Sequence, residues 1–171
     1  MPDQAFQLST PSAPLRSSAK ASAVPATSLP DHAPLGPSID RELAACRRSG
    51  TPLAVVAIGI DGIESVGRQH GHDVEHQLLH AVWNRFKNHL RATDLGVRVG
   101  GHEFGAVLLN AIGMTAAIVD ARLSDVLSQP YGIGALEITL SARTGVAVYP
   151  QAGSTGEALA AAALQNAIAK R

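Results

Sequence analysis

Residues 95–109 read LGVRVGGHEFGAVLL, the most informative segment of the chain. Two segments, 95–99 and 104–109, have the pattern of strands and flank Gly100 and Gly101, and a pair of glycines between strands favours a tight turn. The segment therefore predicts an antiparallel β-hairpin.

The segments before the hairpin alternate between strand and helix patterns. Residues 53–60 form a continuous apolar run, which fits a strand buried on both faces. Apolar side chains recur every four residues over 73–90, the clearest helix in the chain. Shorter helices are expected from Ser38, as an N-cap, and over 61–69, where Gly71 ends the pattern.

A helix is expected over 115–127 after the hairpin, then one or two strands over 136–149 and an alanine-rich helix over 155–170. This order is that of a βαββαβ core with additions. The predicted fold class is α/β, with an open central sheet flanked by helices.

The N-terminal segment has a different composition. Seven of the ten prolines lie in residues 1–37, and half of the other residues there are Ser, Ala or Thr. Such a segment buries too little apolar surface to order itself, so we expect a disordered tail over 1–37 and a folded domain over 38–171. The alternative is a transit peptide. The segment has only Arg16 and Lys20 as basic residues, which are too few to favour it.

Composition excludes several classes of protein. Fourteen Lys and Arg balance fourteen Asp and Glu, so a general nucleic-acid binder is not expected. The single cysteine, Cys46, excludes an intramolecular disulfide and a cysteine-based zinc site. The longest apolar run is far shorter than the ~20 residues that span a bilayer. No signal-peptide pattern opens the chain, so we expect a cytoplasmic protein.

Four motifs together indicate a family. Gly100-Gly101-His102-Glu103-Phe104 resembles the GGDEF signature of diguanylate cyclases, with histidine at the third position. The segments GH (71–72) with QLL (77–79), GVAVYP (145–150) and AK (169–170) resemble the family's GH…GDxLL, SIGxAxYP and YxAK motifs. The resemblance covers about residues 38–171.

This resemblance implies a nucleotide-cyclase-like sheet with a palm- or ferredoxin-like core. It also implies the joining of two GTP molecules into cyclic di-GMP by two divalent metals and two facing domains.

The metal carboxylates that the resemblance implies are missing. The first Asp of the family's DxD corresponds to Gly59, and only the second survives, as Asp61. The other carboxylate, at the third signature position, is His102, and imidazole suits zinc, copper or nickel better than Mg²⁺. We therefore expect no catalytic residue in the signature and no metal or other cofactor; Mg²⁺ would be needed only by a residually active enzyme.

The substrate positions implied by the resemblance have changed as well. The guanine-reading Asn and Asp correspond to Gly67 and His76, and the lysine after DxDxF corresponds to Glu64, which would repel a triphosphate. Lys170 matches a phosphate-contacting lysine, although such a cation is common at helix ends. These departures predict a catalytically inactive domain.

A second site is suggested by Arg91 and Asp94, which match the family's RxxD inhibitory site for cyclic di-GMP. An arginine can donate to guanine or phosphate, and an aspartate can accept from the guanine N1 and N2 edge. Arg122 corresponds to a further arginine of that site. The alternative is structural, because arginines at helix ends and aspartates in turns are ordinary.

Other residues have competing interpretations. Histidines at i, i+4 and i+8 could bind a metal, with a fourth from the hairpin, or could be solvated: His72, His76, His80 and His102. Trp83 and Phe86 are expected in the core or at a dimer face. Asp61 could cap the helix that follows it, and Cys46 is expected to be half-buried.

The sequence thus predicts an inactive GGDEF domain of cyclic di-GMP signalling. It would bind the nucleotide through Arg91, Asp94 and Arg122 and relay that binding to an unidentified protein partner, without nucleic-acid binding or membrane insertion. The alternatives are a residual diguanylate cyclase and an interaction scaffold that binds no nucleotide. A homodimer is also compatible with the sequence.

Overall fold

A computed structural model describes residues 29–170 of the chain. The helices are α1 (Leu35–Ser49), α2 (Ile63–His70), α3 (His72–Asn88), α4 (Gly113–Leu127) and α5 (Gly156–Ala169). The strands are β1 (Leu53–Asp61), β2 (Leu95–Arg98), β3 (Glu103–Leu109), β4 (Tyr131–Ile133), β5 (Leu136–Ile138) and β6 (Ser141–Tyr149).

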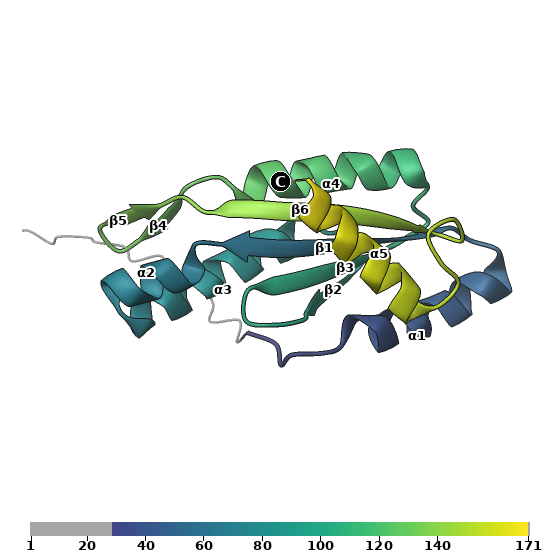
Figure 1. Cartoon of the computed structure of the whole chain (residues 1–171), viewed down its shortest axis with the longest axis horizontal. Coiled ribbons are helices and arrows are strands. Elements are labelled where there is room, and N and C mark those ends of the chain that lie inside the picture. The colour runs from purple at the N-terminus through teal and green to yellow at the C-terminus, as the bar shows by residue number, and fades with distance from the viewer. Residues whose placement is uncertain (1–28, 171) are drawn as a thin grey trace, which may run out of the picture.

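The central sheet has the strand order β2-β3-β1-β6, and every pairing in it is antiparallel (Figure 1). The predicted hairpin forms from β2 and β3, and β1 lies between β3 and β6. Gly59 on β1 pairs with Glu103 on one side and with Arg143 on the other. The expected α/β class and βαββαβ core are confirmed.

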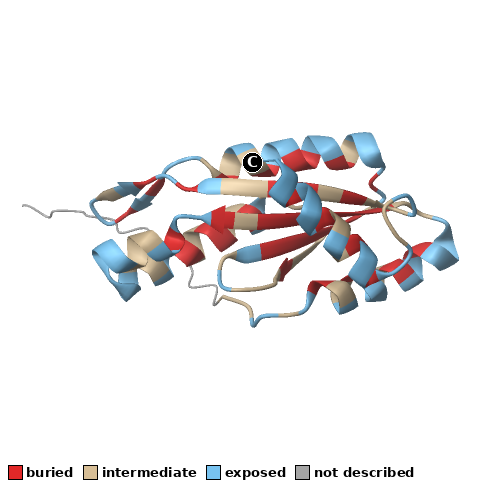
Figure 2. Cartoon of the chain, in the orientation of Figure 1, coloured by how far each residue is buried: buried red, intermediate tan, exposed pale blue. Residues whose placement is uncertain are grey.

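Helices cover both faces of the sheet, and the side chains of β1 alternate between the two layers. Ala54, Val56 and Ile58 face a core shared with α3 and α4. Val55 and Ala57 face a second core shared with α1 and α5. This double burial explains the unbroken apolar run, which Figure 2 shows as a buried band along the sheet.

An aromatic cluster fixes the hairpin against α3. Trp83 and Phe86 are buried, and each ring centroid lies 5.8 Å from that of Phe104 on β3. The core interpretation of these two residues is confirmed. The packing holds the start of β3, and with it the hairpin tip, in a fixed position relative to α3.

The first helix begins at Leu35, so the expectation that Ser38 caps it is wrong. Pro34 is the N-cap, and the Ser38 hydroxyl instead bonds the Pro34 carbonyl at 3.0 Å. Leu35 is buried and fills the space above Gly105, where a Cβ would lie 2.5 Å from its Cδ1. Residues 1–28 of the expected tail lie outside the described residues.

Two further details differ from the sequence-based expectations. The short ribbon of β4 and β5, which turns at Gly134 with φ 60°, was not predicted as a separate sheet. Cys46 is buried, at 4% exposure, rather than half-buried. No helix over 29–170 is long and apolar enough to cross a membrane.

Candidate functional site

The hairpin tip meets the end of β1 at a charged pocket of about 310 Å³. It is lined by Gly59, Ile60, Asp61, Glu64, Gly101, His102, Glu103 and Arg143. Backbone bonds fix the tip: the Ile60 amide donates to the His102 carbonyl at 3.0 Å, and the Val99 amide donates to the Glu103 carbonyl at 2.9 Å. The signature residues are therefore held in place by main-chain geometry.

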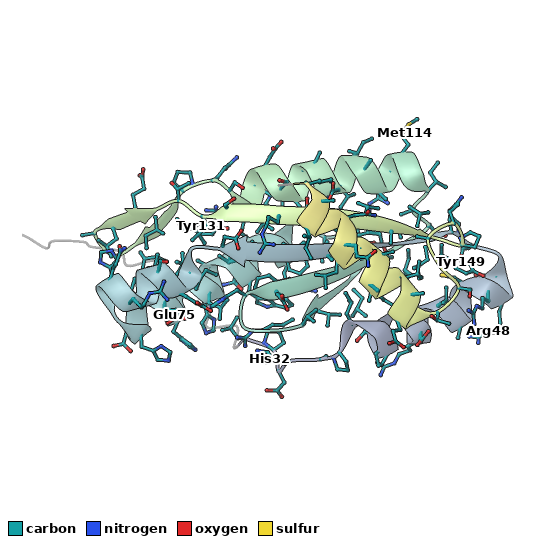
Figure 3. All side chains as sticks on the ribbon, in the orientation of Figure 1. His32, Arg48, Glu75, Met114, Tyr131 and Tyr149 are labelled. Atoms are coloured by element: carbon teal, nitrogen blue, oxygen red, sulfur yellow. The ribbon has the colours of Figure 1, made fainter. Side chains whose placement is uncertain are left out.

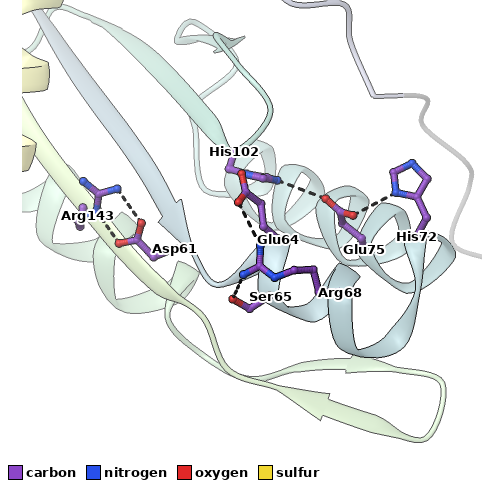
Figure 4. Close-up of polar contacts among 8 residues, drawn as sticks. All are labelled: Asp61, Glu64, Ser65, Arg68, His72, Glu75, His102 and Arg143. Atoms are coloured by element: carbon purple, nitrogen blue, oxygen red, sulfur yellow. Dashed lines mark hydrogen bonds and ion pairs between the residues drawn. The ribbon is translucent and has the colours of Figure 1, made fainter.

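His102 lies between two carboxylates (Figure 4). Its Nδ1 is 3.7 Å from Glu64 on α2, and its Nε2 is 3.6 Å from Glu75 on α3. The other oxygen of Glu75 lies 3.1 Å from Nδ1 of His72. The imidazole thus brings the hairpin within 4 Å of a carboxylate on each of the two helices.

Glu75 also fills the space left by a missing side chain at Gly67. A Cβ at Gly67 would lie 2.8 Å from the Glu75 carboxyl carbon. The resemblance assigns Gly67 to a guanine-reading asparagine, so an acidic side chain of this chain now lies where that residue would project.

The space above Gly59 is filled in the same way. A Cβ at Gly59 would lie 3.3 Å from Nη2 of Arg143. Arg143 bonds both oxygens of Asp61, with Nε and Nη2 at 2.6 and 2.7 Å. The expectation that Asp61 caps α2 is therefore wrong, since Gly62 is the N-cap and no side chain bonds the helix start.

The hydrogen bonds to Asp61 raise the pKa of Arg143 above its ordinary value. The negative charges of Asp61 and Glu103 act in the same direction, whereas desolvation opposes them. The guanidinium is a permanent positive charge in this pocket.

The divalent metals that the resemblance implies do not fit these residues. Within 29–170, no three His, Cys, Asp or Glu side chains are arranged to hold a metal ion. The two nitrogens of His102 face different carboxylates, so Glu64 and Glu75 do not converge on one imidazole nitrogen. His76 and His80 contact each other edge to face at 4.7 Å between ring centroids.

Lys170 is the C-cap of α5 and pairs with Asp120, a buried residue of α4. The sequence predicted a cation at the end of a helix, and the structure adds an ion pair that connects the end of α5 to α4. It also gives the Lys170 ammonium group a partner within the chain.

The three residues of the second predicted site lie around the end of α3. Asp94 accepts a 3.0 Å bond from the Arg91 amide, which closes the turn between α3 and β2. Arg122 on α4 donates to the carbonyl of His89, the C-cap of α3, at 2.9 Å. Arg91 and Arg122 are both exposed, so two cationic side chains border one turn.

Arg143 and Glu75 were missed as site residues by the sequence reasoning. Both stand at positions where the family motifs quoted above have small residues, namely the serine of SIGxAxYP and the glycine of GD. A charged residue replacing a small one beside a site was the available signal.

A family model described as "Diguanylate cyclase, GGDEF domain" matches residues 24–170. The bifunctional diguanylate cyclase/cyclic di-GMP phosphodiesterase MucR of Pseudomonas aeruginosa is 32% identical over 129 residues. These are 75% of this chain and 19% of MucR. The cyclic di-GMP phosphodiesterase NbdA of the same species is 30% identical over 70% of this chain and 15% of NbdA. The chain thus spans less than a fifth of either relative.

Solved structures agree on the fold. A sensory box/GGDEF family protein from Caulobacter crescentus superposes with a TM-score of 0.73 at 29% identity, over 79% of this chain and 88% of that one. The GGDEF domain of DgcB from the same species, solved with c-di-GMP, gives 0.71 at 17% identity over 78% and 80%. The second likeness bears on the fold alone.

Proposed function

The chain belongs to the GGDEF-domain family, and on that premise we propose that it acts in cyclic di-GMP signalling by binding the dinucleotide without synthesising it. The proposed binding surface consists of Arg91, Asp94 and Arg122. The observation that carries the proposal is the hydrogen bond from Arg122 to the end of α3, which brings its guanidinium beside the RxxD turn.

The chemistry of these residues suits a cyclic dinucleotide. Exposed arginines can donate paired bonds to phosphate oxygens or to the O6 and N7 atoms of guanine. One oxygen of Asp94 bonds the Arg91 amide, and a carboxylate has further acceptor sites for the guanine N1 and N2 protons. Binding of the dinucleotide depends on these two nearby arginines, so the zero net charge of the whole chain does not argue against it.

Loss of catalysis is supported by what occupies the hairpin pocket. Joining two nucleotides at an α-phosphate requires oxygen ligands for divalent metal to offset the developing charge. The pocket offers a glycine and a histidine where the resemblance places those carboxylates, and Glu64 adds negative charge near a triphosphate. We therefore infer that Asp61 and Glu103, the carboxylates that remain beside Gly59, cannot sustain the reaction.

Relay to a protein partner forms part of the proposal. A structure of the diguanylate cyclase SiaD from Pseudomonas aeruginosa contains its activator SiaC, so a related fold forms a complex with a separate protein. The partner of this chain would recognise the nucleotide-bound form.

Two assays test the proposal together. Incubation with GTP and either Mg²⁺ or Mn²⁺, followed by chromatography, should yield no cyclic di-GMP. The melting temperature should rise when cyclic di-GMP is added, because a ligand bound only to the folded state stabilises it. Product formation would establish a residual cyclase, and an unchanged melting temperature would favour a nucleotide-free scaffold.

A further inference from the structure

Gly59 lies at the centre of a row of three residues that crosses the sheet. Its partners are Glu103 on β3 and Arg143 on β6, in direct register on either side. Directly paired residues of antiparallel strands project from the same face. An acidic and a basic side chain therefore flank a position without a side chain.

Arg143 uses the open space above Gly59. Its Nη2 would lie 3.3 Å from a Cβ at that position, and its fork bonds both oxygens of Asp61. Glu103 adds a second negative charge that favours the protonated guanidinium. The positive charge of Arg143 therefore lies at the end of β1, where the carboxylates of Asp61 and Glu103 favour it.

We propose that Arg143 is the resident cation of this pocket and takes the place of a divalent metal ion. The proposal deepens the loss of catalysis in the proposed function, on which it rests. It assigns that loss to an occupied site as well as to missing ligands. Restoring carboxylates at positions 59 and 102 would therefore leave metal binding weak, because the guanidinium stays in place.

The physical basis is competition for the same oxygens. A guanidinium forms a planar, paired contact with a carboxylate and does not lose its proton in proteins. A divalent ion would have to replace both bonds to Asp61 and tolerate a positive charge beside it. A carboxylate introduced at position 59 would bond the Arg143 guanidinium in preference to a metal ion.

The test measures Mn²⁺ binding by calorimetry and by electron paramagnetic resonance, without reference to activity. The decisive pair is Gly59→Asp/His102→Asp and the same protein with Arg143→Ser added. The triple variant should bind Mn²⁺ at least tenfold more tightly than the double variant. Equal affinities, or tight Mn²⁺ binding by the unmodified chain, would overturn the proposal.

If the variants with two restored carboxylates fail to fold, Gly59→Asp and Gly59→Asp/Arg143→Ser repeat the comparison with one restored carboxylate. The second of these should bind Mn²⁺ more tightly than the first, and equal affinities would contradict the proposal. Arg48→Ser is the matched control, since Arg48 lies at the opposite end of the molecule from Glu75 (Figure 3). Titration of cyclic di-GMP into the same proteins separates the two questions. Its failure would overturn the proposed binding function and leave the Mn²⁺ result standing.

Discussion

The guanidinium of Arg122 donates a 2.9 Å hydrogen bond to the backbone carbonyl of His89, and so ties α4 to the end of α3. The carbonyls of a helix C-terminus carry partial negative charge, which favours a cation there. The same bond holds Arg122, which is exposed, at the helix end that precedes the turn closed by Arg91 and Asp94. One contact thus organises the surface proposed to bind cyclic di-GMP.

Arg122→Ala should weaken cyclic di-GMP binding about tenfold, which corresponds to roughly 1.4 kcal/mol. The expected loss is that of one charge-assisted hydrogen-bonding group. Isothermal titration measures it, with Arg48→Ala as an exposed arginine control on α1. Equal affinities of Arg122→Ala and the unmodified chain would remove Arg122 from the site.

Arg85→Met should destabilise the fold by about 1 kcal/mol, because one part-buried and two exposed backbone carbonyls lose a charged donor. Arg85 bonds the carbonyls of Val126, Gln129 and Pro130, and its guanidinium lies 3.7 Å from the centroid of the Tyr131 ring. Urea unfolding measures the change, and Arg41→Met on the exposed face of α1 is the control. A midpoint equal to that of the control would show that these bonds add nothing to stability.

Tyr131 should titrate at higher pH than an ordinary tyrosine. Burial raises the pKa of its hydroxyl, and this effect outweighs the lowering by Arg85. Tyr131 is one of two tyrosines, so Tyr149→Phe leaves it alone for absorbance titration. Ionisation of the folded variant near pH 10, the ordinary tyrosine value, would contradict the expectation.

The same shift predicts a loss of stability in alkali. The pKa of Tyr131 is higher in the folded chain than in the unfolded chain, so its contribution is intact below about pH 10. That contribution is lost as the pH rises through the folded-state pKa. Tyr131→Phe should therefore show a shallower alkaline decline in unfolding free energy than the unmodified chain.

Gly145→Ala should destabilise the domain by about 1–3 kcal/mol or more through overpacking. A Cβ there would lie 2.7 Å from the Asn166 carbonyl carbon and would also meet the backbone of Ala163 and Ala167. Helix α5 would have to move away from β6. Gly132→Ala is the control because a Cβ at Gly132 meets nothing within 4 Å. Matching melting temperatures for the two variants would refute close packing of α5.

Most of the fold could be predicted because it depends on local patterns. The run over 53–60 is apolar because both faces of β1 are covered, and the glycine pair turns β2 into β3. The start of α1 was displaced because Leu35 packs against Gly105, a contact between distant segments. The β4–β5 ribbon has strands of three residues each, too short for a periodic signal.

The sequence predicted which positions belong to the site, but not which side chains contact one another there. Sequence motifs identified Gly59 and His102 as departures from the family pattern, but the partners of these positions come from other elements. Arg143 reaches Gly59 from β6, and Glu75 reaches His102 from α3. Such contacts depend on strand register and helix placement, which cannot be obtained by matching single residues to a motif.

The most direct test of the central claim is isothermal titration of cyclic di-GMP into the purified protein, with Arg91→Ala and Arg48→Ala in parallel. We predict micromolar or tighter binding, about −8 kcal/mol or better, retained in Arg48→Ala and lost in Arg91→Ala. Absence of binding by the unmodified protein, or unchanged binding by Arg91→Ala, would contradict the account.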